Sequence, residues 1–559
     1  MKRNHDTGPE PLDITVYPAC AVAVVVRLLC ERINWSGVID AIIPWDDARA
    51  QIRPSTVLLG LMMNMLVQRT PLYHVEKWAE TMPLGLLLGP DVTAEQLNDD
   101  ACGRALEKLA RYGETIIATL AVRMRALSAQ GSAILHSDTT AFSLFGDYPD
   151  DPSAQVRITF GHSKAHRPDL RQVMLGLTCD AQGNVLLGQM LDGNQSDKAW
   201  HPQWLQTLDQ KLPEQLWRHD LYVSDAAVVT PKAVEKLTQL QVRFLGRLPE
   251  NYKLCSAVKA AAWAQPGQFT DLGSFSPKKH AACYKAQVLS GSLYERDVRC
   301  LVVHSDALDA RKEKTLQREV AAERDTLQRL KESLATRRFS CHDDAVLAAK
   351  TDLQQVHLTW HETQLEVQAE TILNRRPGRP KKDAPPPTRQ AYRVHLSIGD
   401  PDPKALQKER QRRSTFVLVT DDHSFAVRHL LEAYKGQEHA EHAFRWMKDH
   451  PHLDAFYVHK PDRVAGIGML LILGLQLVRW MRSLVRSALA DQPPRVLPDK
   501  RVLPAPSDRV ILEALAPIWL AKIRQPGSEW YQWAAVPPHS ARILKTLGTD
   551  LDDVFTPPT

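Results

Sequence analysis

The chain has 559 residues, of which 44% are hydrophobic, and this length is sufficient for about three or four domains with buried cores. Its 70 basic and 65 acidic residues give a net charge of only +5, so any surface that binds nucleic acid must come from local clusters of charge. The eight Cys residues form no CxxC pair, which argues against structural zinc and a disulfide framework and favours a reducing compartment.

The first part of the chain predicts helices. The start, MKRNHDTGPEPLD, has no apolar segment typical of a signal peptide, so we expect a cytoplasmic protein. Residues 12–115 look mostly helical. Ser55 or Thr56 is placed to cap a helix through VLLGLMMNMLVQ, and Thr93 with Gln96 has the spacing of a capping box ahead of ALEKLARY.

Two Asp residues follow strand-like runs further along the chain. Asp138 ends the apolar run in SAILHSD, and Asp225 closes LYVSD. An open α/β sheet presents its ligand-binding groups where a strand ends and a loop begins. Asp at the end of a strand is also a common cap of a helix or turn, so each residue taken singly has two interpretations.

The residues between and after these two Asp residues predict a definite order of elements. RQVMLGLTCD, the turn AQGN and VLLGQMLDGN predict an antiparallel hairpin. A helix from Asp197 to about Leu212 should follow, then the strand that ends at Asp225, a helix from about Lys232 to Leu240, and VRFLGRL as a strand. The order is three strands, helix, strand, helix, strand.

The composition shifts from about residue 248 to 415. YKAQVLSGSLYERDVRCLVVH is strand-prone, and the charged stretch after it carries an incomplete apolar stripe. Residues 344–373 look like a second helix, which predicts a helical hairpin. Such a hairpin fits either a coiled-coil contact between subunits or, more commonly for a short irregular one, an intramolecular pair.

The segment RRPGRPKKDAPPPTR has two interpretations. Gly-Arg-Pro flanked by basic residues resembles an AT-hook, in which an Arg, here Arg379, enters a narrow A·T minor groove. Pro377 stands where an AT-hook usually has Arg. The same composition is typical of a solvated Pro-rich linker, whose charge can still touch phosphates without specificity.

The run YKGQEHAEHAFRWMK predicts a helix with one distinctive face. At about 100° per residue, Tyr434, Gln437, Glu441 and Lys448 fall within an arc of roughly 60°. An ordinary amphipathic helix gives the same spacing by chance. The apolar stretch AGIGMLLILGLQLV that follows is shorter than a membrane span of ~20 residues and predicts a buried helix.

The same run resembles the Tyr-(2)-Arg-(3)-Glu-(6)-Lys motif of a group of bacterial insertion-sequence DDE transposases, with Gln437 in the Arg position. Four further segments are similar to corresponding parts of these transposases. They are HSDTTAFSLFGDY, FGHSKAHRPDLRQVMLGL, DGNQSDKAW and FLGRLPENYK, so the resemblance covers nearly the whole chain.

The resemblance implies an α/β protein with a ribonuclease-H-like (retroviral-integrase-like) catalytic core, an insertion domain and an N-terminal helical domain. The order of elements derived above is that of this core, whose first and fourth strands carry two Asp residues and whose later helix carries a Glu. The implied catalytic, metal-binding acids are Asp138, Asp225 and Glu441. Three carboxylates of this kind hold two Mg²⁺ ions, with Mn²⁺ as a possible substitute.

The resemblance also implies how the chain is divided. The expected parts are an N-terminal helical domain that binds DNA ends (1–115), the first part of the core (116–247), the insertion domain (248–415), the Glu helix with the helix after it (416–485), and a C-terminal region with a possible role in dimerisation (486–559). For the N-terminal domain, a helical packing or dimerisation module remains the alternative, because no helix there shows an obvious base-reading face.

The implied function is cleavage at transposon ends and strand transfer into target DNA. Tyr434, Gln437, Lys448 and Arg379 would contact double-stranded DNA, namely the terminal inverted repeats and the target. A homodimer in a bacterial cytoplasm, associated with the nucleoid and not with a membrane, is expected. Two rival interpretations are a ribonuclease-H-like nuclease without strand transfer and a non-catalytic DNA-binding protein derived from a transposase.

Overall fold

The computed structural model divides the chain into two compact units, one formed by residues 1–246 with 420–559 and the other by residues 247–419. The residues that it describes are 13–18, 20–46, 51–68, 70–128, 133–163, 166–276, 279–374, 387–448, 458–490, 505–525, 528–533 and 536–547.

The N-terminal part of the first unit is helical. Its helices are α1 (Cys20–Arg32), α2 (Trp35–Ile42), α3 (Pro54–Val67), α4 (Val75–Glu80), α5 (Leu84–Leu87) and α6 (Asp99–Ala126). The predicted capping box is confirmed, because Thr93 and Gln96 cap the short turn that precedes α6. The predicted cap at Ser55 or Thr56 is wrong. Pro54 already occupies the first helical position, where its missing N–H is not needed.

The first unit contains a mixed sheet in the order β4-β3-β2-β5-β6. The strands and the two helices between them are β2 (Ile134–Leu144), β3 (Arg171–Asp180), β4 (Val185–Leu191), α7 (Asp197–Lys211), β5 (Leu221–Ser224), α8 (Pro231–Gln239) and β6 (Phe244–Arg247). β2 pairs antiparallel with β3 and parallel with β5, and β3 and β4 form the predicted antiparallel hairpin. The predicted order of strands and helices is therefore confirmed.

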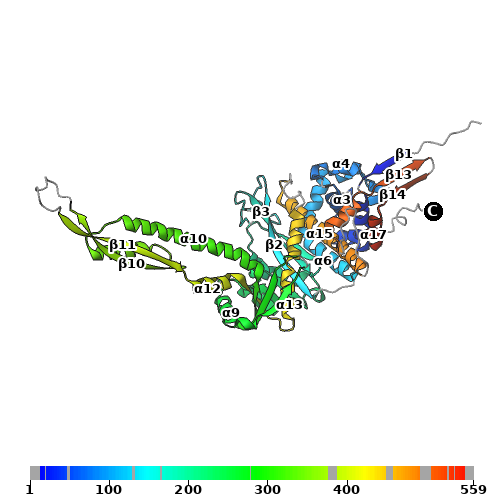
Figure 1. Cartoon of the computed structure of the whole chain (residues 1–559). Coiled ribbons are helices and arrows are strands. Elements are labelled where there is room, and N and C mark those ends of the chain that lie inside the picture. Colours follow the sequence, from blue (N-terminus) through cyan, green and yellow to red (C-terminus); the bar gives the residue numbers. More distant parts are fainter. Residues whose placement is uncertain are drawn as a thin grey trace, which may run out of the picture. The chain divides into compact units, whose positions relative to one another are not determined.

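Helices cover both faces of this sheet. Trp200 of α7 lies against Gly176 of β3, where a Cβ would come within 2.4 Å of the indole. On the other face, Ile472 of α15 (Pro461–Leu489) lies against Gly188 of β4. α15 also packs along α6, as Figure 1 shows, and a Cβ on Gly466 would come within 2.1 Å of a carbonyl oxygen of α6.

The predicted buried helix is confirmed as α15. Its length and hydropathy would suit a membrane span, but its apolar window is fully buried inside the structure, as in the core helix of a globular protein.

The single helix predicted for residues 434–448 is instead two. α13 (Val427–Lys435) ends before Gly436, and α14 (Glu438–Lys448) begins after Gln437. Glu441 and Lys448 lie seven residues apart on α14 and share a face, as predicted. The prediction that Tyr434 and Gln437 belong to the same helix is wrong, because the chain turns at Gly436, a residue with low helix propensity.

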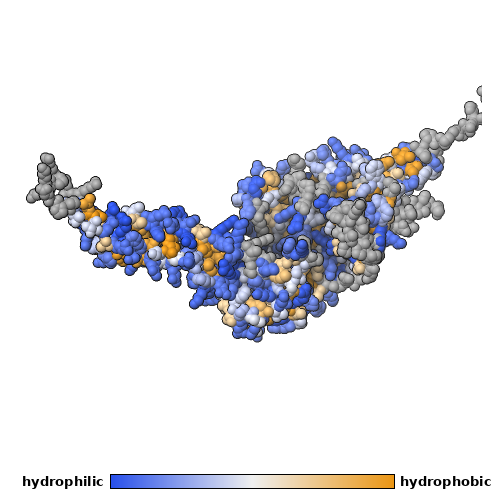
Figure 2. Space-filling model, in the orientation of Figure 1, coloured by the Kyte–Doolittle hydropathy of each residue, from blue (hydrophilic) through white to orange (hydrophobic). Residues whose placement is uncertain are grey.

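A small sheet in the first unit joins strands that are far apart in the sequence. β1 (Asp13–Tyr17) pairs antiparallel with β13 (Leu520–Gln525), which pairs with β14 (Ser528–Trp533). Two helices flank these strands in the sequence, α16 (Asp508–Leu515) and α17 (Pro538–Thr546). Figure 2 shows a hydrophobic area over this small sheet, where Ile14 and Val16 of β1 are exposed.

The second unit has its own strands in the order β12-β9-β8-β7. Its elements are α9 (Lys253–Ala264), β7 (Thr270–Ser274), β8 (Cys283–Leu293), β9 (Arg296–Ser305), α10 (Asp306–Thr336), α11 (His342–Gln354), β10 (His361–Leu373), β11 (Thr388–Pro401), α12 (Pro403–Ser414) and β12 (Thr415–Thr420). The strand-prone run is β8 and β9, which form an antiparallel pair as its composition suggests.

The helix predicted for residues 344–373 is wrong beyond Gln354. Residues 361–373 form β10, which pairs with β11 along its length, and the alternation of charged and apolar residues in HETQLEVQAETIL has the period of a strand. α10 runs beside this pair (Figure 1). Leu316, Leu327 and Leu334 of its apolar stripe are buried within the unit, so the stripe serves an intramolecular contact.

Candidate functional site

The prediction that each Asp ends a strand is right for Asp225, which directly follows β5, and wrong for Asp138, which lies inside β2 because β2 continues in its pairing with β3 to Leu144. β2 and β5 pair at three positions with a constant offset of 87 residues, and the last pair is His136 with Val223. Two residues further along the chain in each case, the same offset relates Asp138 to Asp225. Side chains alternate between the faces of a sheet, so the Asp138 carboxylate is on the face of His136. The structure therefore puts the two predicted residues on neighbouring segments, Asp138 in β2 and Asp225 directly after β5.

Both carboxylates are half-buried and are oriented by local hydrogen bonds. An oxygen of Asp138 accepts a hydrogen bond from the Thr139 N–H at 2.7 Å. Asp225, which is extended, accepts one from the Ala227 N–H at 2.8 Å and so caps the turn after β5. Burial raises the pKa of the Tyr222 hydroxyl, and the negative charges of Asp225 and Asp138 add to the shift, so both carboxylates lie within electrostatic reach of one group.

The third acid is on a helix that lies over β2. The imidazole rings of His136 on β2 and His439 on α14 are 6.3 Å apart, and the ammonium of Lys448 is 5.5 Å from the ring centre of Phe142. His136, Asp138 and Phe142 share one face of β2 because they are separated by even numbers of residues. α14 therefore follows the face of β2 that carries Asp138.

Glu441 lies in α14 between these two contacts, and its side chain is exposed. Within the part of the chain that the structure describes, no group of three or more His, Cys, Asp or Glu side chains is close enough to hold a metal ion. The structure thus puts the two Asp residues on neighbouring segments and the helix of Glu441 over β2, but it does not assemble the three acids into one cluster.

The other predicted site residues have different locations. Tyr434 is half-buried near the end of α13, and Gln437 is half-buried in the turn before α14. Lys448 is exposed at the end of α14. Arg379 lies outside the described residues. The role of each of these residues in binding DNA remains a prediction.

A buried polar network on the reverse face of the sheet was missed by the sequence analysis. His201 of α7 contacts the hydroxyl of Tyr222 through Nδ1 at 3.1 Å and that of Ser224 through Nε2 at 3.0 Å. Ser224 directly precedes Asp225, and Ser137 directly precedes Asp138. The Ser-Asp dipeptide repeated in HSD and VSD is the signal that identifies the two serines. Nothing in the sequence identifies His201.

A cluster of buried charges holds α15 to the C-terminal region. Asp508, the first residue of α16, forms ion pairs with Arg479 at 3.2 Å and with Arg482 at 3.4 Å. All three side chains are almost completely buried. Burial lowers the pKa of Arg482 to about 10, and the neighbouring Arg479 adds to the shift.

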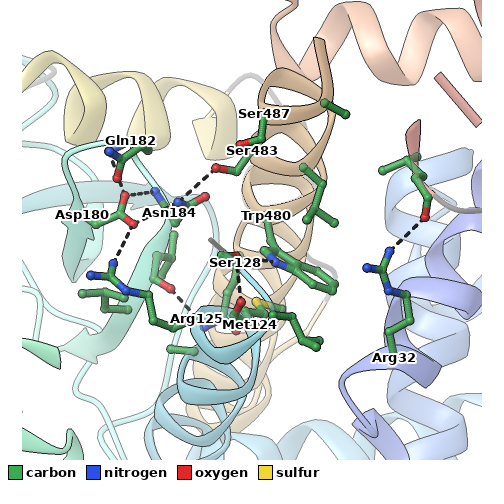
Figure 3. A pocket seen from close by; sticks show the side chains of 18 of the residues that line it. Arg32, Met124, Arg125, Ser128, Asp180, Gln182, Asn184, Trp480, Ser483 and Ser487 are labelled. Carbon is green, nitrogen blue, oxygen red and sulfur yellow. Dashed lines mark hydrogen bonds and ion pairs between the residues drawn. The ribbon is translucent and has the colours of Figure 1, made fainter. Parts of the chain in front are cut away.

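A pocket of about 580 Å³ lies elsewhere in the first unit, between α6, the β3–β4 turn, α15 and α17. Figure 3 shows Asp180 in this pocket between Arg125, 3.5 Å away, and Asn184, 3.0 Å away. Asp180 pairs with Leu135 of β2, three positions before Asp138. None of the predicted site residues lines this pocket, so it has no part in the site formed by the two Asp residues.

Two family models match the chain. A model described as "Transposase DDE domain" matches residues 148–477, which is more than half of the chain. A model described as a domain of unknown function, DUF4277, matches residues 21–122 and therefore most of α1 to α6. No curated protein matches the sequence.

The solved structures that resemble the chain have low sequence identity to it. A piggyBac transposase synaptic complex with hairpin DNA is 8% identical, with a TM-score of 0.37, over 91% of this chain and 82% of that one. A Mos1 transposase paired-end complex with the left transposon end is 15% identical, with a TM-score of 0.15, over 32% of this chain and 58% of that one. A Mos1 mariner paired-end complex with Mn is 12% identical, with a TM-score of 0.14, over 44% and 82%.

Proposed function

The chain belongs to the family defined by the transposase DDE domain, and from this membership we propose that it is the transposase of a bacterial insertion sequence, which cleaves DNA at the transposon ends and joins those ends to target DNA. The observation that carries the proposal is the placement of Asp138 in β2 and of Asp225 directly after β5, the parallel strand that pairs with β2. Acids placed in this way act on one phosphodiester through shared metal ions.

The donor groups fit a divalent cation. Mg²⁺ prefers oxygen ligands, and Asp138 and Asp225 each offer a half-buried carboxylate. Glu441, on the helix over β2, would be the third donor. Bound ions, two Mg²⁺ or alternatively Mn²⁺, would supply activation of the attacking oxygen and stabilisation of the leaving oxygen.

The chain's own residues then hold and orient the DNA. Lys448 lies on the same face of α14 as Glu441, so its ammonium meets a phosphate next to the bond that is cut. Tyr434 and Gln437 contact the DNA from the end of α13 and from the turn. Arg379 adds a contact from the basic segment between β10 and β11, by minor-groove insertion or by phosphate contacts alone.

The N-terminal helices have a packing role in this proposal. α3 is almost entirely buried, and α1, α3 and α6 all contact α15. This burial supports the packing alternative for these helices over the reading of DNA ends. The exposed apolar side chains of Ile14, Val16 and Trp519 support a second copy as partner of the C-terminal region, so that the active complex is a homodimer in the cytoplasm.

The test is a joining assay with linear DNA that carries the terminal inverted repeats flanking the gene, supercoiled target DNA and Mg²⁺. The proposal predicts joined products. Cleavage without joining would instead favour a ribonuclease-H-like nuclease, and end binding without cleavage would favour a non-catalytic DNA-binding protein.

The same assay tests the three acids. Asp138→Asn, Asp225→Asn and Glu441→Gln should each abolish cleavage and joining but preserve most end binding, since the lost charges act on metal and most DNA affinity comes from phosphate contacts elsewhere. Near-normal joining by one of these variants would remove that acid from the site.

A further inference from the structure

The buried network under the two aspartates lies where backbone pairing between their strands stops. The β2–β5 ladder consists of three residue pairs and ends at His136 with Val223. Ser137 and Ser224 are the next residues on each strand, and the two acids follow them. At the level of the serines, side chains replace the backbone ladder as the connection between the strands.

The connection extends towards both strands. His201 contacts both Tyr222 and Ser224, at 3.1 Å and 3.0 Å. The Ser137 side chain is close enough to the Tyr222 hydroxyl to lower its pKa. On the other side of Ser137, its hydroxyl lies 2.6 Å from the hydroxyl of Thr178 on β3. Three strands and α7 are therefore linked through one set of polar groups.

The network is buried. Ser137 and Tyr222 are completely buried, and His201 and Ser224 are each only 1% exposed. Trp200 packs against the His201 ring with 5.0 Å between ring centres. A buried polar network in which every group has a partner fixes the position of its members, because any displacement leaves a polar atom unsatisfied in a medium of low dielectric constant.

We propose that the chain Ser137–Tyr222–His201–Ser224 is a positioning network that fixes the separation and orientation of the Asp138 and Asp225 carboxylates and so sets their affinity for divalent metal. This inference rests on the proposed function. The four residues do not touch the reacting atoms. They act through the backbone of the two Ser-Asp dipeptides, as partners behind metal ligands do in other metal sites.

The sharpest variants remove one hydroxyl each and leave the shape of the core intact. Tyr222→Phe removes the hydroxyl that contacts His201 Nδ1. Ser224→Ala removes the hydroxyl that contacts His201 Nε2, directly before Asp225. Ser540→Ala is the matched control, because Ser540 is also completely buried, with its hydroxyl 2.6 Å from the Ala514 carbonyl oxygen, and belongs to the C-terminal region.

The measurement is Mn²⁺ binding to the complex of full-length protein with transposon-end DNA, followed by the electron paramagnetic resonance signal of free Mn²⁺. Tyr222→Phe and Ser224→Ala should each weaken Mn²⁺ binding by about 10- to 100-fold. Their loss of cleavage should recover at saturating metal. Their combined effect should be less than the product of the two, since both break the same chain of contacts. Ser540→Ala should match them in melting temperature and leave Mn²⁺ affinity unchanged.

Two results would overturn the inference, and they are distinguishable. If Asp138→Asn removes Mn²⁺ binding but Tyr222→Phe and Ser224→Ala bind Mn²⁺ as the wild type does, the network has only a structural role. If the wild-type complex binds no Mn²⁺, or Asp138→Asn binds it normally, the proposed function itself fails and the inference fails with it.

Discussion

Gly436 lies directly against the imidazole of His136. A Cβ on residue 436 would be 2.8 Å from Nε2 and 2.9 Å from Cε1 of that ring, which is closer than side-chain carbons approach other heavy atoms. His136 is almost completely buried on β2, two residues before Asp138, and Gly436 is in the turn that leads into α14. The absence of a side chain at residue 436 thus sets how closely the Glu441 helix approaches the strand of Asp138.

Gly436→Ala should therefore lower the rate of end cleavage, because the added methyl group moves α14 away from β2. The backbone of Gly436 is right-handed helical, so alanine causes no backbone strain there. His136→Ala in the same chain should restore part of the rate by opening space for the methyl group. Cleavage assays on both variants test this, and an unchanged rate in Gly436→Ala would show that the contact does not control the helix.

Lys448→Ala should weaken binding to transposon ends and reduce the salt dependence of binding by about one counterion, since one phosphate contact is lost. Gln437→Arg should act in the opposite direction by adding a phosphate contact. Binding measured at several salt concentrations tests both variants. Arg509→Ala, which removes an exposed cation on α16, is the control. If Lys448→Ala leaves both affinity and salt slope unchanged, this face of α14 is only a solvated surface.

The raised pKa of Asp220 should make the stability of the folded protein depend on pH. Burial raises the pKa of Asp220 from 3.8 to about 7, against the opposing effect of Arg125. The folded protein therefore holds a proton on this group between about pH 4 and pH 7 that the unfolded chain has lost, so the group's contribution to stability falls as pH rises through this range. Asp220→Asn should raise the melting temperature relative to the wild type at pH 8 and change it little at pH 4. An equal rise in melting temperature at both pH values would contradict this assignment. The control is Asp150→Asn, which replaces an exposed carboxylate.

Asp508→Asn should destabilise the first unit strongly. The change leaves Arg479 and Arg482 buried without a counter-charge, and breaking a buried ion pair in this way costs about 3–5 kcal/mol. The matched control is Glu513→Gln, which breaks the exposed pair with Arg509 on the same helix and should cost less than about 1 kcal/mol. Chemical denaturation measures both. Equal effects would show that water reaches the Asp508 cluster.

The sequence was sufficient to predict elements whose pattern is local. The β3–β4 hairpin has two apolar runs around the turn AQGN, and α7 begins at Asp197 after a Ser cap, so both are visible in the chain itself. The placement of Asp138 and Asp225 on neighbouring segments is predicted by a resemblance combined with the order of elements, because no local pattern states which strands are neighbours. For residues 361–373, the alternation of HETQLEVQAETIL indicates a strand. The helix that is predicted from the charged stretch before them wrongly includes these residues.

Features that depend on contacts between distant segments were not predictable. To predict the break between α13 and α14 at Gly436, one must know that His136, 300 residues earlier, lies against this glycine. The burial of His201 between Tyr222 and Ser224 likewise depends on the packing of α7 on the sheet. A single sequence gives residue types and spacings, whereas these features are set by which faces of helices and strands meet.

The pairing of β1 with β13 has a consequence for the synthesis of the protein. Asp13 is opposite Arg524, so the first described strand meets its partner only after the long intervening chain has been translated. Helices near the start, such as α1, contact α15 and α16 in the same core. Until α15 and α16 have been translated, the apolar faces that the early helices bury against them stay uncovered, and such species favour chaperone binding or aggregation. Completion of the first unit is therefore expected only after β13 has been translated, and polypeptides that stop before β13 should not accumulate as folded protein.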